Sequence, residues 1–196
     1  MKSEGAGGVA PSPFTLHLSP FTLHPSPFTF HDLAFTILVT ASMPPDSRPM
    51  SFSTGTISTF VMPHMQNVRG DLFGGELMAL VDQAAAVAAI RHAGGPAVTA
   101  SIDRVDFRER IPLGALVTCN ATVDYVGNSS MDVTIEVYAE KVSTGERRHT
   151  NTAHVVFVAI DEQGKPKRVP RLIPETEEER ARYSRAEAYR ARQPAR

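Results

Sequence analysis

Residues 74–92 predict a helix that is apolar on nearly every side. Gly94, Gly95 and Pro96 follow it as a strong stop signal. The apolar positions within it are Leu77, Met78, Leu80, Val81, Ala84, Ala85, Val87, Ala88 and Ile90. A helix without a polar face has to be enclosed, so a sheet must wrap around it. Because a small sheet cannot cover every side of a helix this long, we expect a second chain to cover the remainder.

Strand-like segments lie on both sides of this helix in the sequence. One precedes it and four follow it; they span 56–62, 97–107, 115–126, 130–142 and 147–161. Apolar residues alternate with polar ones, as at Val133, Ile135 and Val137. One buried helix inserted after the first strand of an antiparallel sheet predicts the α+β class. We place this domain at residues 51–170, followed by a polar, exposed and partly frayed helical tail at 171–196.

The first fifty residues differ from the rest of the chain. A unit of seven residues, with a proline in every copy, repeats as SPFTLHL, SPFTLHP and SPFTFHD over residues 12–32. Proline and serine at this density build neither a coiled coil nor a packed core. We therefore expect residues 1–50 to be a disordered extension that folding does not need. A true start at Met43 or Met50 would also explain the repeat.

A secretory signal is an alternative reading of residues 33–41, which form an apolar run. However, about thirty residues precede this run, with a single lysine among them and an aspartate directly before the run, which is unlike a signal peptide. We therefore expect a cytoplasmic protein.

Charge and cysteine content exclude several classes of protein. The chain carries 20 Lys and Arg against 21 Asp and Glu, which argues against a nucleic-acid partner. Cys119 is the single cysteine, which excludes an internal disulfide, and no zinc-ligand spacing surrounds it. No apolar run approaches the roughly 18 residues of a membrane span, so we expect no membrane insertion.

Four motifs occur in an order that resembles the hotdog-fold acyl-CoA thioesterases. They are NVRGDLFGGELMALVDQAA at 67–85, RHAG at 91–94, TASIDRVDF at 99–107 and VGNSSMDV at 126–133. The cytosolic acyl-CoA hydrolases and their single-domain bacterial relatives are the most similar group. The resemblance covers about residues 52–170 and rests on several motifs at matching spacing. One departure is Leu80, where members often carry a bulky aromatic residue or a lysine.

The resemblance implies a five-stranded antiparallel sheet wrapped around one long central helix. It implies homodimers, commonly assembled into trimers of dimers. The implied activity is hydrolysis of acyl-CoA to a free fatty acid and CoA, without a metal or another cofactor.

Asp82 is the candidate base or nucleophile. A carboxylate in an enclosed apolar helix is costly unless it is paired or used in chemistry. Arg91, nine residues away, is not an intrahelical partner. The alternative is a structural aspartate bonded to a strand hydroxyl or a backbone amide. Resemblance to the family favours the catalytic role.

Gly74 and Gly75 are candidate oxyanion donors, because free amides and the helix dipole favour negative charge at a helix N-terminus. The alternative is a tight turn into the helix. Seven residues separate Gly75 from Asp82, about 10.5 Å along a helix. Both groups must reach one reacting carbon, so we expect a composite site with the glycine amides and Asp82 from different chains.

Asn67 aligns with an asparagine that the family uses opposite its catalytic aspartate, and its amide would orient water or hold the thioester carbonyl. An ordinary turn residue is the alternative. His64 is interpreted as a solvent-facing loop residue. The phosphates and pantetheine of CoA need donors, and the candidates are Arg104, Arg108, Arg110, Ser129, Ser130, Lys165, Lys167 and Arg168.

Two other functions remain open at this point. A hotdog dehydratase needs a histidine paired with a carboxylate, and the central helix has no histidine before His92 at its end. A non-catalytic acyl-CoA sensor is the second alternative. A transcriptional sensor would need a DNA-binding module, which the proline-rich first fifty residues cannot form. Ligand binding without turnover would indicate a sensor.

Overall fold

The computed structural model describes residues 46–107 and 109–192, without the side chains at 104, 106 and 107. The larger sheet has five antiparallel strands in the order β2-β4-β5-β6-β3. Their bounds are β2 Thr54–Phe60, β3 Ala97–Phe107, β4 Leu116–Val126, β5 Ser130–Lys141 and β6 Glu146–Ala159. The predicted α+β arrangement is confirmed.

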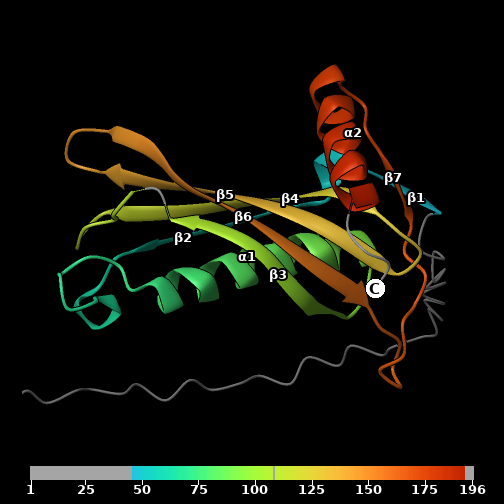
Figure 1. The fold of residues 1–196 in the computed structure, drawn as a ribbon, viewed down its shortest axis with the longest axis horizontal. Helices are drawn as coiled ribbons and strands as arrows, with labels where there is room; N and C mark the ends of the chain where they lie inside the picture. The colour runs from blue at the N-terminus through green and yellow to red at the C-terminus, as the bar shows by residue number, and fades with distance from the viewer. Residues whose placement is uncertain (1–45, 108, 193–196) are drawn as a thin grey trace, which may run out of the picture. The chain divides into compact units, whose positions relative to one another are not determined.

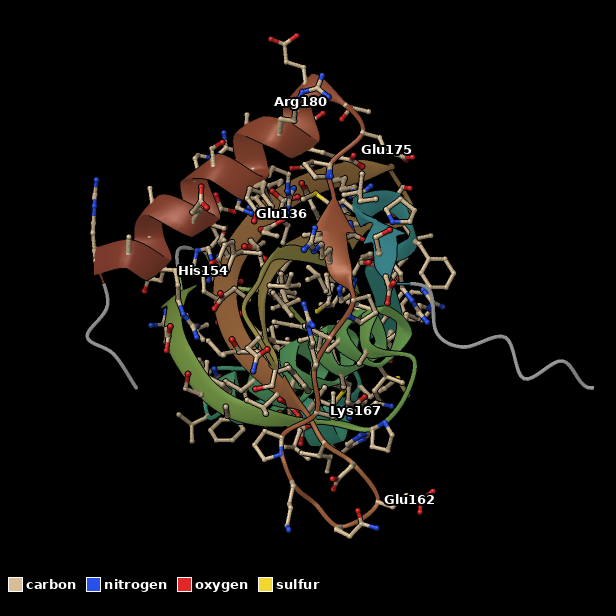
Figure 2. The ribbon with its side chains drawn as sticks, turned by 90° about the vertical axis from the view of Figure 1, so that its right-hand side faces the viewer. Glu136, His154, Glu162, Lys167, Glu175 and Arg180 are labelled. Atoms are coloured by element: carbon tan, nitrogen blue, oxygen red, sulfur yellow. The ribbon has the colours of Figure 1, made fainter. Side chains whose placement is uncertain are left out.

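The central helix α1 (Gly74–Ala93) connects the two edge strands of this sheet, because it follows β2 and precedes β3. The short helix η2 (Pro63–Met65) lies in the loop between β2 and α1. Figure 2 shows the sheet curling around α1, which lies in its concave face. The helix ends at Gly94, whose φ of 65° is the left-handed conformation that glycine adopts without strain. Figure 1 shows α1 running along the length of the strands.

Small residues let α1 lie close to the sheet. Ala84, Ala85 and Ala88 are fully buried in the same hydrophobic core as strand residues such as Val133. Gly55 in β2 marks the tightest contact, since an added Cβ would lie 2.5 Å from the Ala84 carbonyl oxygen. Close packing here fixes how α1 is rotated against the sheet.

One side of α1 remains uncovered in a single chain. Met78 and Ile90 are 38% and 45% exposed, respectively, and Gln83 lies on the surface with them. The chain's own sheet therefore does not enclose the helix on every side. Cover by a second chain stays a prediction.

The N-terminal boundary predicted at residue 51 is too late. Strand β1 (Ser47–Pro49) pairs in parallel with β7 (Arg171–Ile173), and Met50, in the short helix η1 (Met50–Phe52), is only 1% exposed. Residues 47–50 and 171–173 therefore belong to the folded unit. Local composition could not reveal this pairing, because the two strands are more than 120 residues apart. The predictions for residues 1–45 lie outside the described residues.

The C-terminal helix α2 (Glu177–Arg192) has no buried residue, as its polar sequence predicts. It is nevertheless anchored to the outer face of the sheet. Arg182 pairs with Asp124 at 2.9 Å, and Arg190 pairs with Asp132 at 2.8 Å. In Figure 2, Glu136 and His154 lie on the strands beneath α2. Among the described residues, no helix is long and apolar enough to cross a membrane.

Candidate active site

The N-terminal end of α1 presents free backbone donors. Phe73 is the N-cap residue, and no described side chain caps this end. The first intrahelical bond runs from Leu77 N to Phe73 O, so the N–H groups of Gly74, Gly75 and Glu76 have no acceptor within the helix. The helix dipole adds partial positive charge at the same place. This end can therefore stabilise negative charge on a ligand oxygen.

Gly75 also has a local structural reason to be glycine. An added Cβ would lie 2.4 Å from an atom of the Phe73 ring. The ring packs against the first turn of α1, so helix entry itself favours glycine at this position.

Asn67 lies in a tight turn before α1. Its Oδ1 accepts hydrogen bonds from Arg69 N at 2.8 Å and from Asp71 N at 3.3 Å. These bonds fix the orientation of the carboxamide. No described residue accepts a hydrogen bond from Asn67 Nδ2, so this nitrogen has both protons available for a ligand. The side chain of Asn67 therefore stabilises the turn and also offers a free hydrogen-bond donor.

Asn67 and Gly74 line one cleft of about 330 Å³. The other lining residues are Arg69, Asp71, Leu72, Leu77, Glu109, Arg110 and Ile111. Leu72 N donates to Ile111 O at 2.8 Å, which joins the loop at 109–112 to the segment that precedes α1. The cleft therefore combines amide donors with charged side chains.

Asp82 lies further along α1 and is held by a strand residue. Thr99 Oγ1 in β3 donates a hydrogen bond to Asp82 Oδ1 at 2.6 Å. The pairing of β3 with β6 shifts register between Thr99 and Ser101, and such bulges re-aim side chains. This bond is the strand-hydroxyl partner that the structural alternative predicted. A charge-assisted bond of this length also orients a carboxylate for chemistry.

A single chain does not bring the candidate catalytic groups together. Asp82 is absent from the described lining of the cleft that contains Asn67 and Gly74. Asp82 is partly exposed and Thr99 is exposed, so the enclosure that the helix sequence predicted is not provided by the chain itself. His64 is exposed, as predicted.

Several candidate CoA-binding residues gather at the other end of α1. Lys167 and Arg168 line a cleft of about 710 Å³ together with Ala93 at the helix C-terminus. Lys167 N donates to Ala159 O, and Ala159 N donates to Ser129 O, so backbone bonds join this segment to the turn after β4. Figure 2 shows Lys167 near the base of the loop that carries Glu162.

The remaining candidates have separate positions. Lys165 closes that loop, because its N–H donates to Asp161 Oδ1 at 2.8 Å. The Ser130 hydroxyl accepts a hydrogen bond from Arg190 Nη2 at 3.1 Å, so it contacts α2. The backbone of Arg104 lies opposite His154 in the β3–β6 register, and the side chain of Arg104 is not among the described parts. Arg108 lies outside the described residues, whereas Arg110 lines the cleft with Asn67.

Comparison with known proteins places the chain in a family. The family model described as the thioesterase superfamily matches residues 69–146. An acyl-CoA thioester hydrolase of Bacillus subtilis, YkhA, named as uncharacterized, is 42% identical over 135 residues, which cover 69% of this chain and 78% of that protein. The chain belongs to the acyl-CoA thioester hydrolases.

Solved structures agree with this family and confirm the predicted hotdog fold. A hexameric acyl-CoA thioesterase in its apo form has a TM-score of 0.72 and 39% identity, covering 74% of this chain and 93% of that one. The acyl-CoA hydrolase of Staphylococcus aureus, in complex with butyryl-CoA, CoA and CoA disulfide, has a TM-score of 0.68 and 37% identity, covering 74% and 92%.

Alanine variants of the Staphylococcus aureus hydrolase have also been solved. They replace an asparagine, an aspartate and a threonine. In that chain the aspartate follows the asparagine by fifteen residues, and the threonine follows the aspartate by seventeen. Sequence analysis of the present acyl-CoA thioester hydrolase assigned no role to Thr99. The only feature in the sequence that pointed to Thr99 was its hydroxyl at the start of the TASIDRVDF motif.

Proposed function

We propose that this protein hydrolyses the thioester bond of acyl-CoA to a free fatty acid and CoA. One observation carries the residue assignment. Asp82 follows Asn67 by fifteen residues and Thr99 follows Asp82 by seventeen, which is the spacing of the three residues replaced in the Staphylococcus aureus enzyme. The hydrogen bond from Thr99 to Asp82 gives this spacing a physical meaning.

Asp82 acts in this proposal as the general base or the nucleophile. Thr99 holds Oδ1, which leaves Oδ2 to face the substrate. As a base, Asp82 takes a proton from water, the resulting hydroxide attacks the carbonyl carbon, and the C–S bond breaks with the proton passing to the CoA sulfur. As a nucleophile, Asp82 forms an anhydride with the acyl group, which releases CoA before water cleaves the anhydride. Both routes use the same oriented carboxylate.

The carbonyl oxygen needs donors while it gains negative charge. Asn67 Nδ2 and the N–H groups of Gly74 and Gly75 supply them in this proposal. Loss of one such donor typically costs about 10²–10³ in turnover. No step of this chemistry uses a metal or another cofactor.

We propose that two chains build each site. The cleft of one chain offers Asn67 and Gly74 but lacks Asp82, and α1 leaves Met78 and Ile90 exposed for a partner to cover. The hexameric state of one solved relative supports an oligomer, which we take to be a trimer of dimers.

The cationic segment at the C-terminal end of α1 is assigned to the CoA nucleotide. Lys165, Lys167 and Arg168 would contact phosphates, with Ser129 and Ser130 in the neighbouring turn. Contacts of Arg104 and Arg108 with CoA stay predictions from the sequence. A cytoplasmic location also stays a prediction.

Subunit exchange tests the composite site. Asp82→Ala and Asn67→Ala should each lose at least about 10²-fold in turnover while the protein stays folded at the assay temperature, although Asn67→Ala also loses the turn bonds to Arg69 N and Asp71 N. Mixing the two variants should restore activity, since one site of each mixed dimer receives both native residues. An equal mixture after random exchange should reach about a quarter of the wild-type rate.

Mass spectrometry must confirm the exchange, and thiol release reports the activity. Exchange without recovered activity would show that Asn67 and Asp82 do not act across chains. A wild-type protein that binds acyl-CoA without releasing thiol would indicate the sensor alternative. Assays across acyl-CoAs of increasing length would then define the chain-length preference.

A further inference from the structure

The cleft that contains Asn67 carries balanced charge in its lining. Arg69 and Arg110 contribute two cations, and Asp71 and Glu109 contribute two carboxylates. A substrate with phosphate groups gains no net attraction from a neutral lining. The charge that the cleft presents therefore depends on residues that pair with its lining from outside.

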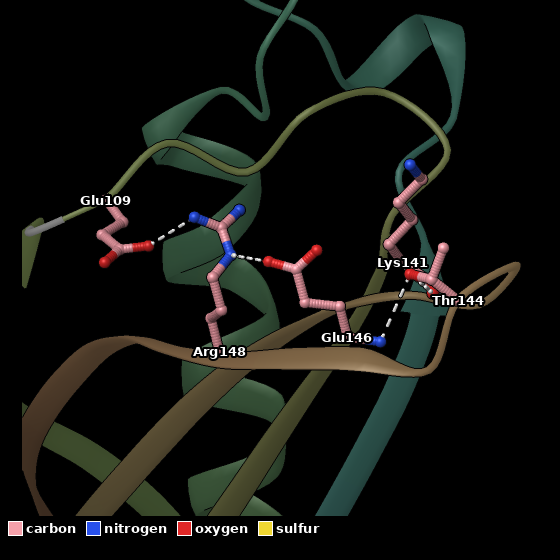
Figure 3. Close-up of polar contacts among 5 residues, drawn as sticks. All are labelled: Glu109, Lys141, Thr144, Glu146 and Arg148. Atoms are coloured by element: carbon pink, nitrogen blue, oxygen red, sulfur yellow. Dashed lines mark hydrogen bonds and ion pairs between the residues drawn. The ribbon is translucent and has the colours of Figure 1, made fainter.

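Arg148 on β6 is such a residue. Its Nη1 lies 2.8 Å from Glu109 Oε2, and its Nε lies 3.8 Å from Glu146 Oε1 (Figure 3). Neither Arg69 nor Arg110 forms an ion pair with another residue of the described parts of the chain. The carboxylate of Glu109 is therefore paired outside the lining, and the two lining arginines stay available.

The β5–β6 hairpin fixes the position from which Arg148 acts. Thr144 Oγ1 donates to Lys141 O at 3.2 Å and accepts from Glu146 N at 3.4 Å, which closes the hairpin turn (Figure 3). Arg148 follows Glu146 by two residues on β6. The ion pair with Glu109 thus joins the β5–β6 hairpin to the loop at 109–112 that lines the cleft.

We propose that Arg148 is a specificity-determining positioning residue. By pairing with Glu109 it offsets the negative charge of that carboxylate, so that Arg69 and Arg110 attract the anionic CoA ester toward the site, while the segment at 165–168 contacts its phosphates. The inference rests on the proposed function and deepens it. Arg148 is not in the lining of the cleft, so it acts through Glu109 and changes substrate affinity rather than the chemical step.

Kinetics of Arg148→Met test this role. We expect KM for acyl-CoA to rise about two- to fivefold, the range of a partly exposed ion pair, with kcat unchanged. The side chains of Arg148 and Glu109 are 48% and 43% exposed, so a larger effect is not expected. KM for the same acyl group on N-acetylcysteamine, which has no phosphate, should not change.

A second substitution separates charge from loop support. Adding Glu109→Gln to Arg148→Met removes the unpaired carboxylate and should return KM for acyl-CoA to its wild-type value. Removal of a purely structural anchor would not be rescued in this way. Arg147→Met is the matched control, because Arg147 lies over the Tyr138 ring at 4.2 Å, and the ion pairs of the described residues join Glu109 to Arg148 and not to Arg147.

Three results would overturn the inference while leaving thioesterase activity in place. They are an unchanged KM in Arg148→Met, an equal rise with the neutral thioester, and a double variant that stays impaired. Wild-type protein that hydrolyses neither thioester would refute the proposed function itself and the inference with it.

Discussion

Thr99 on an edge strand donates a 2.6 Å hydrogen bond to Asp82 in the middle of the central helix. This bond joins β3 to α1 and holds one carboxylate oxygen at a fixed place. In the proposed mechanism the second oxygen is the one that faces the substrate, so this bond would select which atom of Asp82 reacts.

Replacing Thr99 by valine should reduce turnover by about tenfold or more, because a hydrogen bond to a charged group is worth roughly 1.5–3 kcal/mol. Valine keeps the shape of threonine and removes only the donor. Thr99→Ser should retain most of the activity, since serine restores the hydroxyl. Thiol-release kinetics with melting temperatures will check this, and equal activity of the valine and serine variants would refute the role of the hydroxyl.

Gly55 should be intolerant of a methyl group. A Cβ there would meet the Ala84 carbonyl oxygen at 2.5 Å and the Ala88 amide nitrogen at 3.0 Å. Because backbone atoms cannot move aside cheaply, Gly55→Ala should destabilise the fold by about 1–3 kcal/mol. Gly95→Ala is the control, since a methyl group there would meet nothing within 4 Å. Chemical denaturation of both variants will show whether the loss is specific to Gly55.

Stability should decrease in acid because of His92. Its Nε2 donates to Pro170 O at 3.0 Å, so Nδ1 accepts the Ser53 hydroxyl at 2.7 Å. Burial, with a contribution from nearby Arg48, holds the pKa of His92 below its usual value of 6.5, although the bond to Pro170 opposes this shift. The unfolded chain then binds more protons below pH 6.5, so the free energy of unfolding falls as the pH drops through that value.

The slope contributed by His92 should be at most about 1.4 kcal/mol per pH unit. Urea midpoints between pH 8 and pH 5 measure it. His92→Gln should flatten this dependence, whereas His64→Gln, at an exposed position, should retain it. Identical pH slopes for wild type and His92→Gln would contradict the assignment.

Cys119 should not react in the folded protein. Its side chain is fully buried in β4, and burial raises the pKa of its thiol to about 12. Because the thiolate is the reactive form, a disulfide reagent should detect no protein thiol before denaturation and one per chain after it. Rapid labelling of native protein would contradict this. If Cys119 does not react in the folded protein, the thiol detected in a thiol-release assay comes only from CoA.

The sequence predicted the elements of this fold well, because their signals are local. The apolar run and the Gly94 stop fixed α1 to within a residue of Gly74–Ala93, and alternation located the strands of the sheet. Asp82 could be singled out because a carboxylate in an apolar helix is costly within that helix alone. Asn67 depended on motif order, since an asparagine before a glycine turn is common.

Tertiary structure decided the partners of those residues. Thr99 meets Asp82 because α1 packs against the sheet that ends in edge strand β3, and β3 shifts register beside Thr99. Two further contacts join segments that are far apart in the chain. Strand Ser47–Pro49 pairs with Arg171–Ile173, and Glu109 forms an ion pair with Arg148. A periodic pattern reports which face of an element is apolar, whereas these contacts depend on register and chain path. The sequence by itself therefore determined the central helix, the strands of the larger sheet and the costly carboxylate, and the packing of sheet on helix determined what that carboxylate contacts.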